Sequence, residues 1–361
     1  MPAVLANMEQ RKLISLVSGV LALIVAALLP LFLDPLSDYL DFGIFALAYV
    51  MFALGLNIVV GFAGLLDLGY VAFYAIGAYS IGWFASDHFS IWLVLLMAGV
   101  ATAVVGVIIG LPTLRLRGDY IAIVTLAFGE IIFTIATNGD AVEIAGYKLT
   151  AGQQAISPVD QPKLPGFAEL DSAFSLRGYF WLGLCMAVIV LIINLMLRES
   201  RLGRAWIALR EDEVAAASMG VPLVKTKLLA YAIGAALGGA AGAFLGSYNN
   251  AINSNQFQFS FSILVLSMII LGGLGSVWGV VLGGFVLTLI DRKVPDWLDP
   301  LDIPGKLGLN LSIADLKIGI FGFLLVIMMV LRPQGLFPER RRKIELTEGI
   351  GTDEAVYDAR A

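Results

Sequence analysis

Two acidic side chains stand within otherwise apolar parts of this sequence, and they are the first candidates for chemistry. Glu130 lies in the middle of the apolar stretch 120–137. An unpaired charge in the centre of such a stretch costs on the order of 2.5–3.5 kcal/mol or more. We therefore expect Glu130 to face other helices, to be protonated or to be paired. A structural hydrogen bond and a place on a substrate pathway both remain open for it.

Asp67 is the second candidate, and it follows a glycine-rich break in the apolar pattern. Its carboxylate can cap a helix that begins at Leu68. Alternatively, N–H groups at the helix start beside Gly64 and Gly69 would meet a substrate carboxylate if the break lies at membrane depth. The preceding stretch 42–60 covers about 28 Å at 1.5 Å per residue. That length places Asp67 near one face of a membrane and favours the capping role.

The residues after Asp67 form an aromatic face, which consists of Tyr70, Phe73, Tyr74, Ile76 and Tyr79. Such a face can bind an apolar side chain, although faces of this kind more commonly pack against other helices. Tyr70 and Tyr74 therefore join Asp67 and Glu130 as candidates for a substrate pathway.

Other kinds of chemistry have little support in the sequence. One histidine, His88, and one cysteine, Cys185, exclude a multi-histidine metal site, a thiolate cluster and a disulfide framework. No G-x-x-x-x-G-K-[ST] loop occurs, so the chain does not bind ATP through a P-loop. The net charge of −5 argues against nucleic acid as a partner. We predict no catalytic residue, no metal and no cofactor.

The composition is that of a protein embedded in a lipid bilayer. Hydrophobic residues make up 59% of the 361 residues and charged residues 14%, whereas soluble domains contain about 45–50% and about 25%. Several apolar stretches are long enough to cross about 30 Å of hydrocarbon. We predict an all-α bundle of about ten transmembrane helices, some of them short or broken. Their expected positions are 13–33, 42–60, 68–86, 91–111, 120–137, 179–197, 228–248, 259–274, 276–290 and 313–331.

The charge distribution predicts how these helices are organised. Residues 1–337 form one transmembrane domain, interrupted by a charged loop at 198–227 and followed by a flexible tail at 338–361. With ten helices, the arginine-rich ends and the charged loop fall on one side and the acidic loops on the other. The positive-inside rule then places the N-terminus, the C-terminus and the charged loop in the cytoplasm.

The charged loop has two interpretations. It can be a solvated loop that only obeys the positive-inside rule. Against this, a predicted helix over 204–219 carries Trp206, Leu209, Val214 and Ala217 near one face, and Gly220-Val221-Pro222 predicts where it stops. An amphipathic helix of this kind is typical of a segment that docks on another protein.

The stretch after the loop has a glycine at every fourth position, namely Gly234, Gly238, Gly242 and Gly246. Small residues on one helix face allow helix backbones to approach closely in lipid. We interpret this face as a helix-packing surface, which is favoured over direct contact with a solute.

Several motifs resemble those of one family of transport proteins. Arg210–Gly220 is similar to the R-E-D-E-x-A-A-x-x-M-G form of the coupling loop in ABC importer permeases of the branched-chain amino-acid, LivM type. Further matches lie at 64–79, 115–120, 271–276 and 331–336, and the resemblance covers roughly 42–337. Two positions depart from the pattern. Val214 stands where many importer permeases have an acid, and 149–156 replaces a Thr-Gly-Gly-x-x-Gly-Ile segment.

The resemblance implies a permease subunit of an ATP-driven importer. Such a subunit passes branched-chain or other hydrophobic amino acids from an external solute-binding protein to the cytoplasm, across the bacterial inner membrane. Its implied partners are a second homologous permease subunit and two cytoplasmic ATPase subunits. By the family's pattern, the residues that couple to the ATPases are Arg204, Arg210, Glu211, Asp212, Glu213, Ala215, Ala216 and Gly220.

Two other functions stay open at this point. An ion-coupled secondary transporter would account for Glu130 and Asp67 without any ATPase partner. Permeases of the same family that carry urea, amides or other amino acids share the motifs. A membrane-embedded enzyme is the weakest alternative, because no paired acids, Ser/His group or metal cluster is visible in the sequence.

Overall fold

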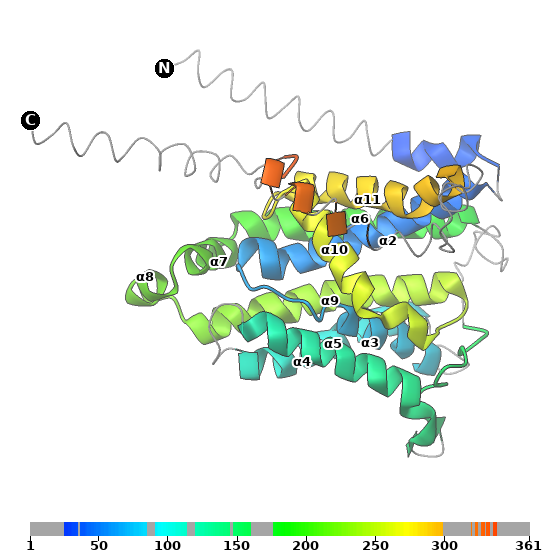
Figure 1. Ribbon diagram of the computed structural model, residues 1–361, viewed down its shortest axis with the longest axis horizontal. Helices are drawn as coiled ribbons and strands as arrows, with labels where there is room; N and C mark the ends of the chain where they lie inside the picture. Colours follow the sequence, from blue (N-terminus) through cyan, green and yellow to red (C-terminus); the bar gives the residue numbers. More distant parts are fainter. Residues whose placement is uncertain are drawn as a thin grey trace, which may run out of the picture.

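The computed structural model describes residues 25–34, 37–84, 91–113, 120–144, 147–159 and 176–298, together with single positions and short stretches between 319 and 337. Over these residues the protein is a bundle of helices, with α7 and α8 projecting at one end (Figure 1). Among the described residues, five helices are long and apolar enough to cross a membrane, at Asp38–Phe62, Trp92–Pro112, Tyr120–Ala141, Leu176–Glu199 and Leu223–Asn249.

The elements follow one another in a simple order. After a helical segment at 25–32 come α2 (Asp38–Leu56), the π-helical turn η1 (Asn57–Phe62), α3 (Val71–Phe84), α4 (Ile91–Thr113), α5 (Tyr120–Asn138) and the short η2 (Gly139–Ala141). The second half contains α6 (Leu176–Glu199), α7 (Arg201–Glu211), α8 (Glu213–Ser218), α9 (Leu223–Asn249), η3 (Ser254–Phe257), α10 (Phe259–Gly272) and α11 (Val277–Leu298). A small antiparallel pair, β1 (Glu143–Ile144) and β2 (Tyr147–Lys148), follows η2.

Helix α9 is the centre of the bundle, because α2, α3 and α4 all pack against it. Close approach depends on its glycines. A Cβ atom at Gly242 would lie 2.6 Å from the carbonyl oxygen of Tyr74, and one at Gly238 would lie 2.7 Å from the Tyr70 hydroxyl. Gly246 faces Ala78, and Gly234 faces the backbone of Gly55. The glycine face of α9 therefore lies against α3 and α2.

Several boundaries differ from those expected. The helix expected at 42–60 starts at Asp38 and continues as η1 to Phe62. The helix expected to begin at Leu68 begins at Val71. Helix α11 extends to Leu298 rather than 290, with Pro295 inside it. These shifts lengthen the apolar helices or move their ends into the turns between them.

Parts of the predicted topology fall outside the described residues. These are most of the helix expected at 13–33, most of that at 313–331, and the tail 338–361. The described part contains the five membrane-length helices and two shorter apolar ones, Val71–Phe84 and Phe259–Gly272. The count of ten transmembrane helices therefore stays a prediction.

Candidate functional site

Helix α7 is fixed to the bundle by its buried face. The Ser200 hydroxyl caps its first turn by accepting a hydrogen bond from the Gly203 N–H at 3.1 Å. Trp206 is fully buried, and its indole N–H donates to the carbonyl oxygen of Thr226 at 2.8 Å. Leu209 is also buried. Since Thr226 lies in the first turn of α9, α7 is joined directly to the central helix.

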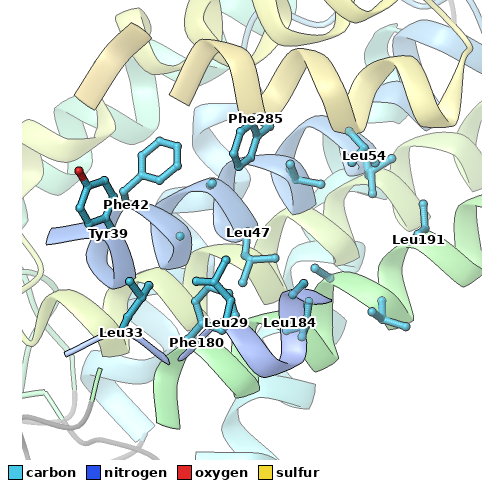
Figure 2. A pocket seen from close by; sticks show the side chains of 17 residues that line it. Leu29, Leu33, Tyr39, Phe42, Leu47, Leu54, Phe180, Leu184, Leu191 and Phe285 are labelled. Carbon is cyan, nitrogen blue, oxygen red and sulfur yellow. The ribbon is translucent and has the colours of Figure 1, made fainter. Parts of the chain in front are cut away.

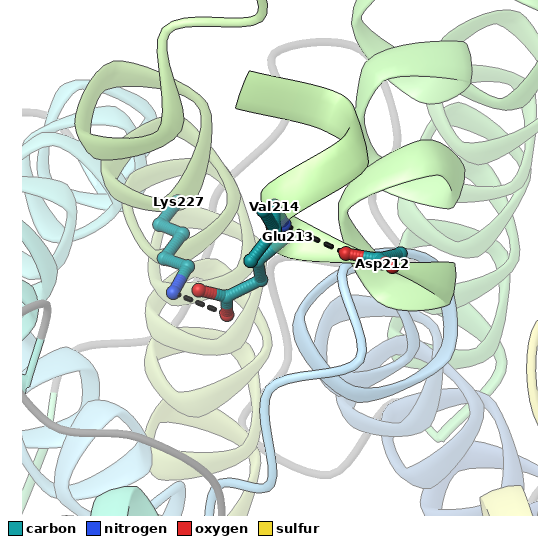
Figure 3. A network of polar contacts seen from close by, with 4 residues as sticks. All are labelled: Asp212, Glu213, Val214 and Lys227. Atoms are coloured by element: carbon teal, nitrogen blue, oxygen red, sulfur yellow. Dashed lines mark hydrogen bonds and ion pairs between the residues drawn. The ribbon is translucent and has the colours of Figure 1, made fainter. Parts of the chain in front are cut away.

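The expected helix over 204–219 is two helices rather than one. The chain turns at Asp212, whose φ of −154° is extended. Its carboxylate accepts hydrogen bonds from the N–H groups of Val214 at 2.7 Å and Ala215 at 3.0 Å, and so caps α8 (Figure 3). The break redirects α8, so the expected common apolar face is wrong. Val214 and Ala217 are exposed, whereas Trp206 and Leu209 are buried.

Glu213, the first residue of α8, holds that helix to α9. Its carboxylate pairs with the Lys227 ammonium at 2.5 Å, and the Lys227 side chain is only 5% exposed (Figure 3). A buried ammonium needs a partner. The pair therefore provides a second attachment between the polar helices and the start of α9.

Helix α8 ends in a tight reversal at Gly220. The Val221 N–H bonds to the carbonyl of Ala216 at 3.1 Å, and the Gly220 N–H bonds to that of Ala217 at 2.9 Å. Gly220 has a φ of +84°, the left-handed conformation that this ending requires. No heavy atom lies within 4 Å of a Cβ built at this residue, so its backbone conformation, rather than space, favours glycine.

The outer surface of α8 exposes apolar side chains. Val214 is 73% exposed and Met219 is 85% exposed. Ala215 is exposed beside them, whereas Ala216 is buried. Glu211 and Asp212 are exposed as well. The pair of helices thus presents an apolar patch with acidic neighbours at the end of the bundle.

Arg210 makes a third attachment, one that the sequence did not indicate. Its guanidinium donates to the carbonyl oxygen of Gly61 at 2.5 Å, in η1. Its aliphatic part fills the space beside Gly64, which has a φ of +71°. A polar cavity of about 290 Å³ lies between this turn, α7 and Ile121. Arg204, by contrast, is exposed, and its guanidinium donates to the nearby Glu199 carbonyl at 2.8 Å.

The polar helices are joined to the bundle at three points. Trp206, Arg210 and Glu213 of α7 and α8 make these contacts. Their partners lie in α9 and in η1.

Asp67 is buried in the turn before α3, without capping a helix at Leu68. One carboxylate oxygen accepts a hydrogen bond from the Gly69 N–H at 2.8 Å, and the Leu68 N–H donates to the Thr125 hydroxyl at 3.0 Å. These bonds close a turn two residues long and tie it to α5. The helix itself starts two residues beyond Gly69.

The two candidate tyrosines have different surroundings. Tyr70 is fully buried, and its hydroxyl donates to the carbonyl oxygen of Gly234 at 2.9 Å, so it packs α3 on α9. The Tyr74 hydroxyl donates to the side-chain oxygen of Gln256 at 3.4 Å, and its ring contacts Phe52 and Phe261. Tyr74 also lines a cavity, which is described below.

Glu130 lies on an exposed face of α5. Of the three alternatives for Glu130, burial against other helices of this chain does not occur in the part of the chain that the structure describes. Hydrophobic side chains on the same helix, Ile123 and Ile131, are also exposed. Glu130 and Asp67 are both near α5, but Glu130 is on its outer surface and Asp67 is on its buried side.

One cavity between the helices is apolar. It has a volume of about 570 Å³ and lies between the segment 25–32, α2, α6 and α11 (Figure 2). Leu29, Leu47, Phe180 and Leu184 point into it, and Tyr39 supplies a hydroxyl at its edge. The lining residues in the described part carry no charge. A site of this composition suits hydrocarbon and does not bind a charged solute.

These features first define a class of protein. Membrane-length helices surround a tightly packed central helix, and the described residues contain no group of three or more metal-ligating side chains. This is the architecture of a helical membrane protein with a polar appendage at one end. Residues 39–330 match the family described as the permease component of branched-chain amino acid transport systems, and the chain belongs to that family.

Known relatives have the same description. The chain is 35% identical over 337 residues to the high-affinity branched-chain amino acid transport system permease protein LivM of Escherichia coli K12, which covers 87% of this chain and 73% of that protein. It is 34% identical over 332 residues to LivM of Salmonella typhimurium, covering 86% and 72%. It is 27% identical over 257 residues to LivH of Escherichia coli K12, covering 67% and 80%. No solved structure matches the chain.

Proposed function

We propose that this chain is the permease subunit of an ATP-driven importer for branched-chain or other hydrophobic amino acids in the bacterial cytoplasmic membrane. The observation that carries the proposal is the surface of α8, where Val214 and Met219 expose apolar side chains on a helix that is firmly attached to the bundle. Family membership supports the same function. ATP hydrolysis belongs to a partner chain, because this sequence has no P-loop.

The proposed partners follow from the same argument. Two cytoplasmic ATPase subunits bind the transporter, one of them through α7 and α8 of this chain. A second, homologous permease subunit completes the membrane part, and an external solute-binding protein delivers the amino acid. The N-terminus and the C-terminus lie in the cytoplasm with α7 and α8, as the basic residues of these regions favour.

Movement of the ATPases displaces α7 and α8, and three contacts transmit the displacement. Trp206 carries it to α9, the Glu213–Lys227 pair carries it to the same helix, and Arg210 carries it to η1. From η1, the buried Asn57 continues the route, because its side-chain oxygen accepts a hydrogen bond from the Gly275 N–H at 3.1 Å. This bond reaches the turn between α10 and α11.

Glu130 and Asp67 have different places in this proposal. Glu130 is on the exposed face of α5, where an acid at mid-span needs a polar neighbour. The second permease subunit, or the solute passing between the two subunits, supplies that neighbour. Asp67 is tied to the backbone at Gly69, and it holds the turn that joins η1 to α3.

The test changes the surface of α8 without changing its attachments. We expect Val214→Glu and Met219→Glu to weaken binding of the ATPase subunit about tenfold or more, since central apolar contacts dominate interfaces. Both side chains are exposed, so the chain's melting temperature and membrane insertion stay unchanged. Arg201→Glu, an exposed change at the far end of α7, serves as the control.

The measurements are co-purification with the ATPase subunits and L-leucine-stimulated ATP hydrolysis in proteoliposomes that contain the solute-binding protein. Full ATP hydrolysis in both α8 variants would refute docking through this surface. Uptake by the chain without nucleotide, driven by an ion gradient, would instead identify a secondary transporter.

A further inference from the structure

A second cavity is lined by Leu245 and Asn249 at the C-terminal end of α9. This end of α9 is opposite to α7 and α8 (Figure 1). The volume of the cavity is about 460 Å³, within the range of about 300–1,000 Å³ that is typical of small-molecule sites. Six elements form its walls, namely α2, α3, α9, η3, α10 and α11. A site shared by so many elements changes shape when any of them moves relative to the others.

Aromatic rings form one side of this cavity. Tyr49 and Phe261 meet edge to face at 5.8 Å, and Phe261 lies 4.8 Å from the ring of Tyr74. Phe45 continues the wall on α2, with its ring 6.1 Å from Tyr49. Four rings from three helices thus make an apolar surface that fits a branched aliphatic side chain.

Arg292, on α11, brings a positive charge to the lining of the cavity. Among the described lining residues, Arg292 carries the charge, and its guanidinium carbon lies 3.2 Å from the centre of the Phe45 ring. The nearest Asp41 oxygen is 3.6 Å from an Arg292 nitrogen, which is an ion pair too long for a hydrogen bond. The other Asp41 oxygen accepts from the Tyr248 hydroxyl. Arg292 is therefore held in place by the ring and by Asp41, and a closer carboxylate can still bind it.

Two amides complete the polar part of the cavity. Gln256 is fixed, because it accepts from Tyr74 and donates to the carbonyl of Ala251 at 3.3 Å. Asn249, the last residue of α9, also lines the cavity. A guanidinium and two side-chain amides beside an aromatic wall complement a molecule that carries a carboxylate and an ammonium next to an apolar side chain.

We propose that this cavity binds a zwitterionic, apolar amino acid, with Arg292 on its carboxylate, the side-chain amides of Asn249 and Gln256 on its ammonium and the aromatic wall on its side chain. The proposal rests on the function proposed above, and it names a site inside this chain. It also gives the predicted pathway residue Tyr74 a contact with the solute. Asp67, Tyr70 and Glu130 do not line this cavity.

The test measures binding of L-leucine to the purified full-length chain in lipid nanodiscs by equilibrium dialysis. We expect Arg292→Gln to weaken binding at least about tenfold, as loss of a charged hydrogen bond does, and Arg292→Lys to weaken it less. Lys293→Gln is the matched control. It removes the neighbouring cation, which lies 5.3 Å from the Tyr39 ring and does not line the cavity, and binding should stay within about twofold.

Two analogues of L-leucine test the contributions of its carboxylate and its ammonium separately. L-leucinamide lacks the carboxylate and isocaproate lacks the ammonium, so each should compete with L-leucine at least about tenfold less well. If Arg292→Gln does not fold, Asn249→Phe tests the site independently by filling the cavity, and it should abolish binding.

Three results would overturn the proposal: no saturable binding of L-leucine to the wild type, equal competition by L-leucinamide, or unchanged binding in Asn249→Phe. Loss of ATP hydrolysis in the α8 variants together with any of these results would leave the importer function standing and refute this site alone. If the chain binds L-leucine and ATP hydrolysis is unchanged in the α8 variants, the site in this cavity stands and the proposed docking of the ATPase on α8 is refuted.

Discussion

Helix α9 contacts the rest of the protein in two different ways along its length. In its middle, Gly238 and Gly242 bring its backbone against α3 so closely that a Cβ at either position would lie within 2.7 Å of another atom. At its start, Thr226 and Lys227 join it to α7 and α8 by one hydrogen bond and one ion pair. The middle of α9 is held by close van der Waals packing, whereas its start is held by a hydrogen bond and an ion pair.

This difference indicates which parts can move. Close packing resists adjustment, so we expect α3 and α9 to move together. Directional contacts transmit a displacement and can be broken one at a time. The comparison predicts that substitutions in the middle of α9's contacts affect folding, whereas substitutions at its start affect the link to α7 and α8.

The largest effect is expected where two backbones touch. Gly77 of α3 faces the carbonyl of Gly239 with no room for a methyl group, so Gly77→Ala should destabilise the protein by about 3 kcal/mol through overpacking. The measurement is the thermal unfolding of the purified chain in detergent. Gly99→Ala is the control, because its Cβ would lie 3.4 Å from the Ala236 carbonyl, an ordinary contact. Equal melting temperatures for the two variants would refute close packing at this seam.

A smaller effect is expected at the contact with η1. Arg210→Gln removes the charged hydrogen bond to the Gly61 carbonyl, and such bonds contribute about 2 kcal/mol. We expect reduced stimulation of ATP hydrolysis in the assembled transporter, with ATPase binding unchanged. Arg201→Gln, on the same helix but exposed, should behave like the wild type. Normal stimulation of ATP hydrolysis in Arg210→Gln would show that the contact with η1 does not couple α7 to the bundle.

The smallest effect is expected at the ion pair. Glu213→Gln leaves the buried Lys227 ammonium without its partner carboxylate, but the Glu213 side chain is 42% exposed. Solvent screening therefore limits the loss to about 1 kcal/mol. The melting temperature should fall, and Lys227→Met in the same chain should restore it. A double variant no more stable than Glu213→Gln alone would contradict this account.

Much of the molecule could be predicted from its sequence. Membrane-length apolar stretches predicted a helical membrane protein, and five such helices are present in the described residues. The motifs around Glu211 and Gly64 indicated the permease family, and this is confirmed by the match over residues 39–330. The end of the polar helix just before Gly220 was also predicted from the Gly220-Val221-Pro222 stop.

Other expectations failed for physical reasons. The continuous helix over 204–219 was wrong because Asp212 hydrogen-bonds the backbone of Val214 and Ala215 and starts a new helix. The side chain of an aspartate can accept hydrogen bonds from nearby backbone N–H groups and so interrupt a helix. The spacing of apolar residues does not show at which aspartate this happens. The orientation of Glu130 was also not predictable, because a helix that is apolar on all sides does not show which face is buried.

The sequence by itself determined that the chain contains membrane-length apolar helices and to which family it belongs, because hydrophobic length and short motifs are local properties. Only the tertiary structure decided which residues meet. Arg210 reaches Gly61 across 149 positions, and Arg292 reaches Asp41 on another helix. These pairings depend on how the helices pack, and packing in an apolar bundle is set by small residues and shape rather than by the polarity pattern along the chain.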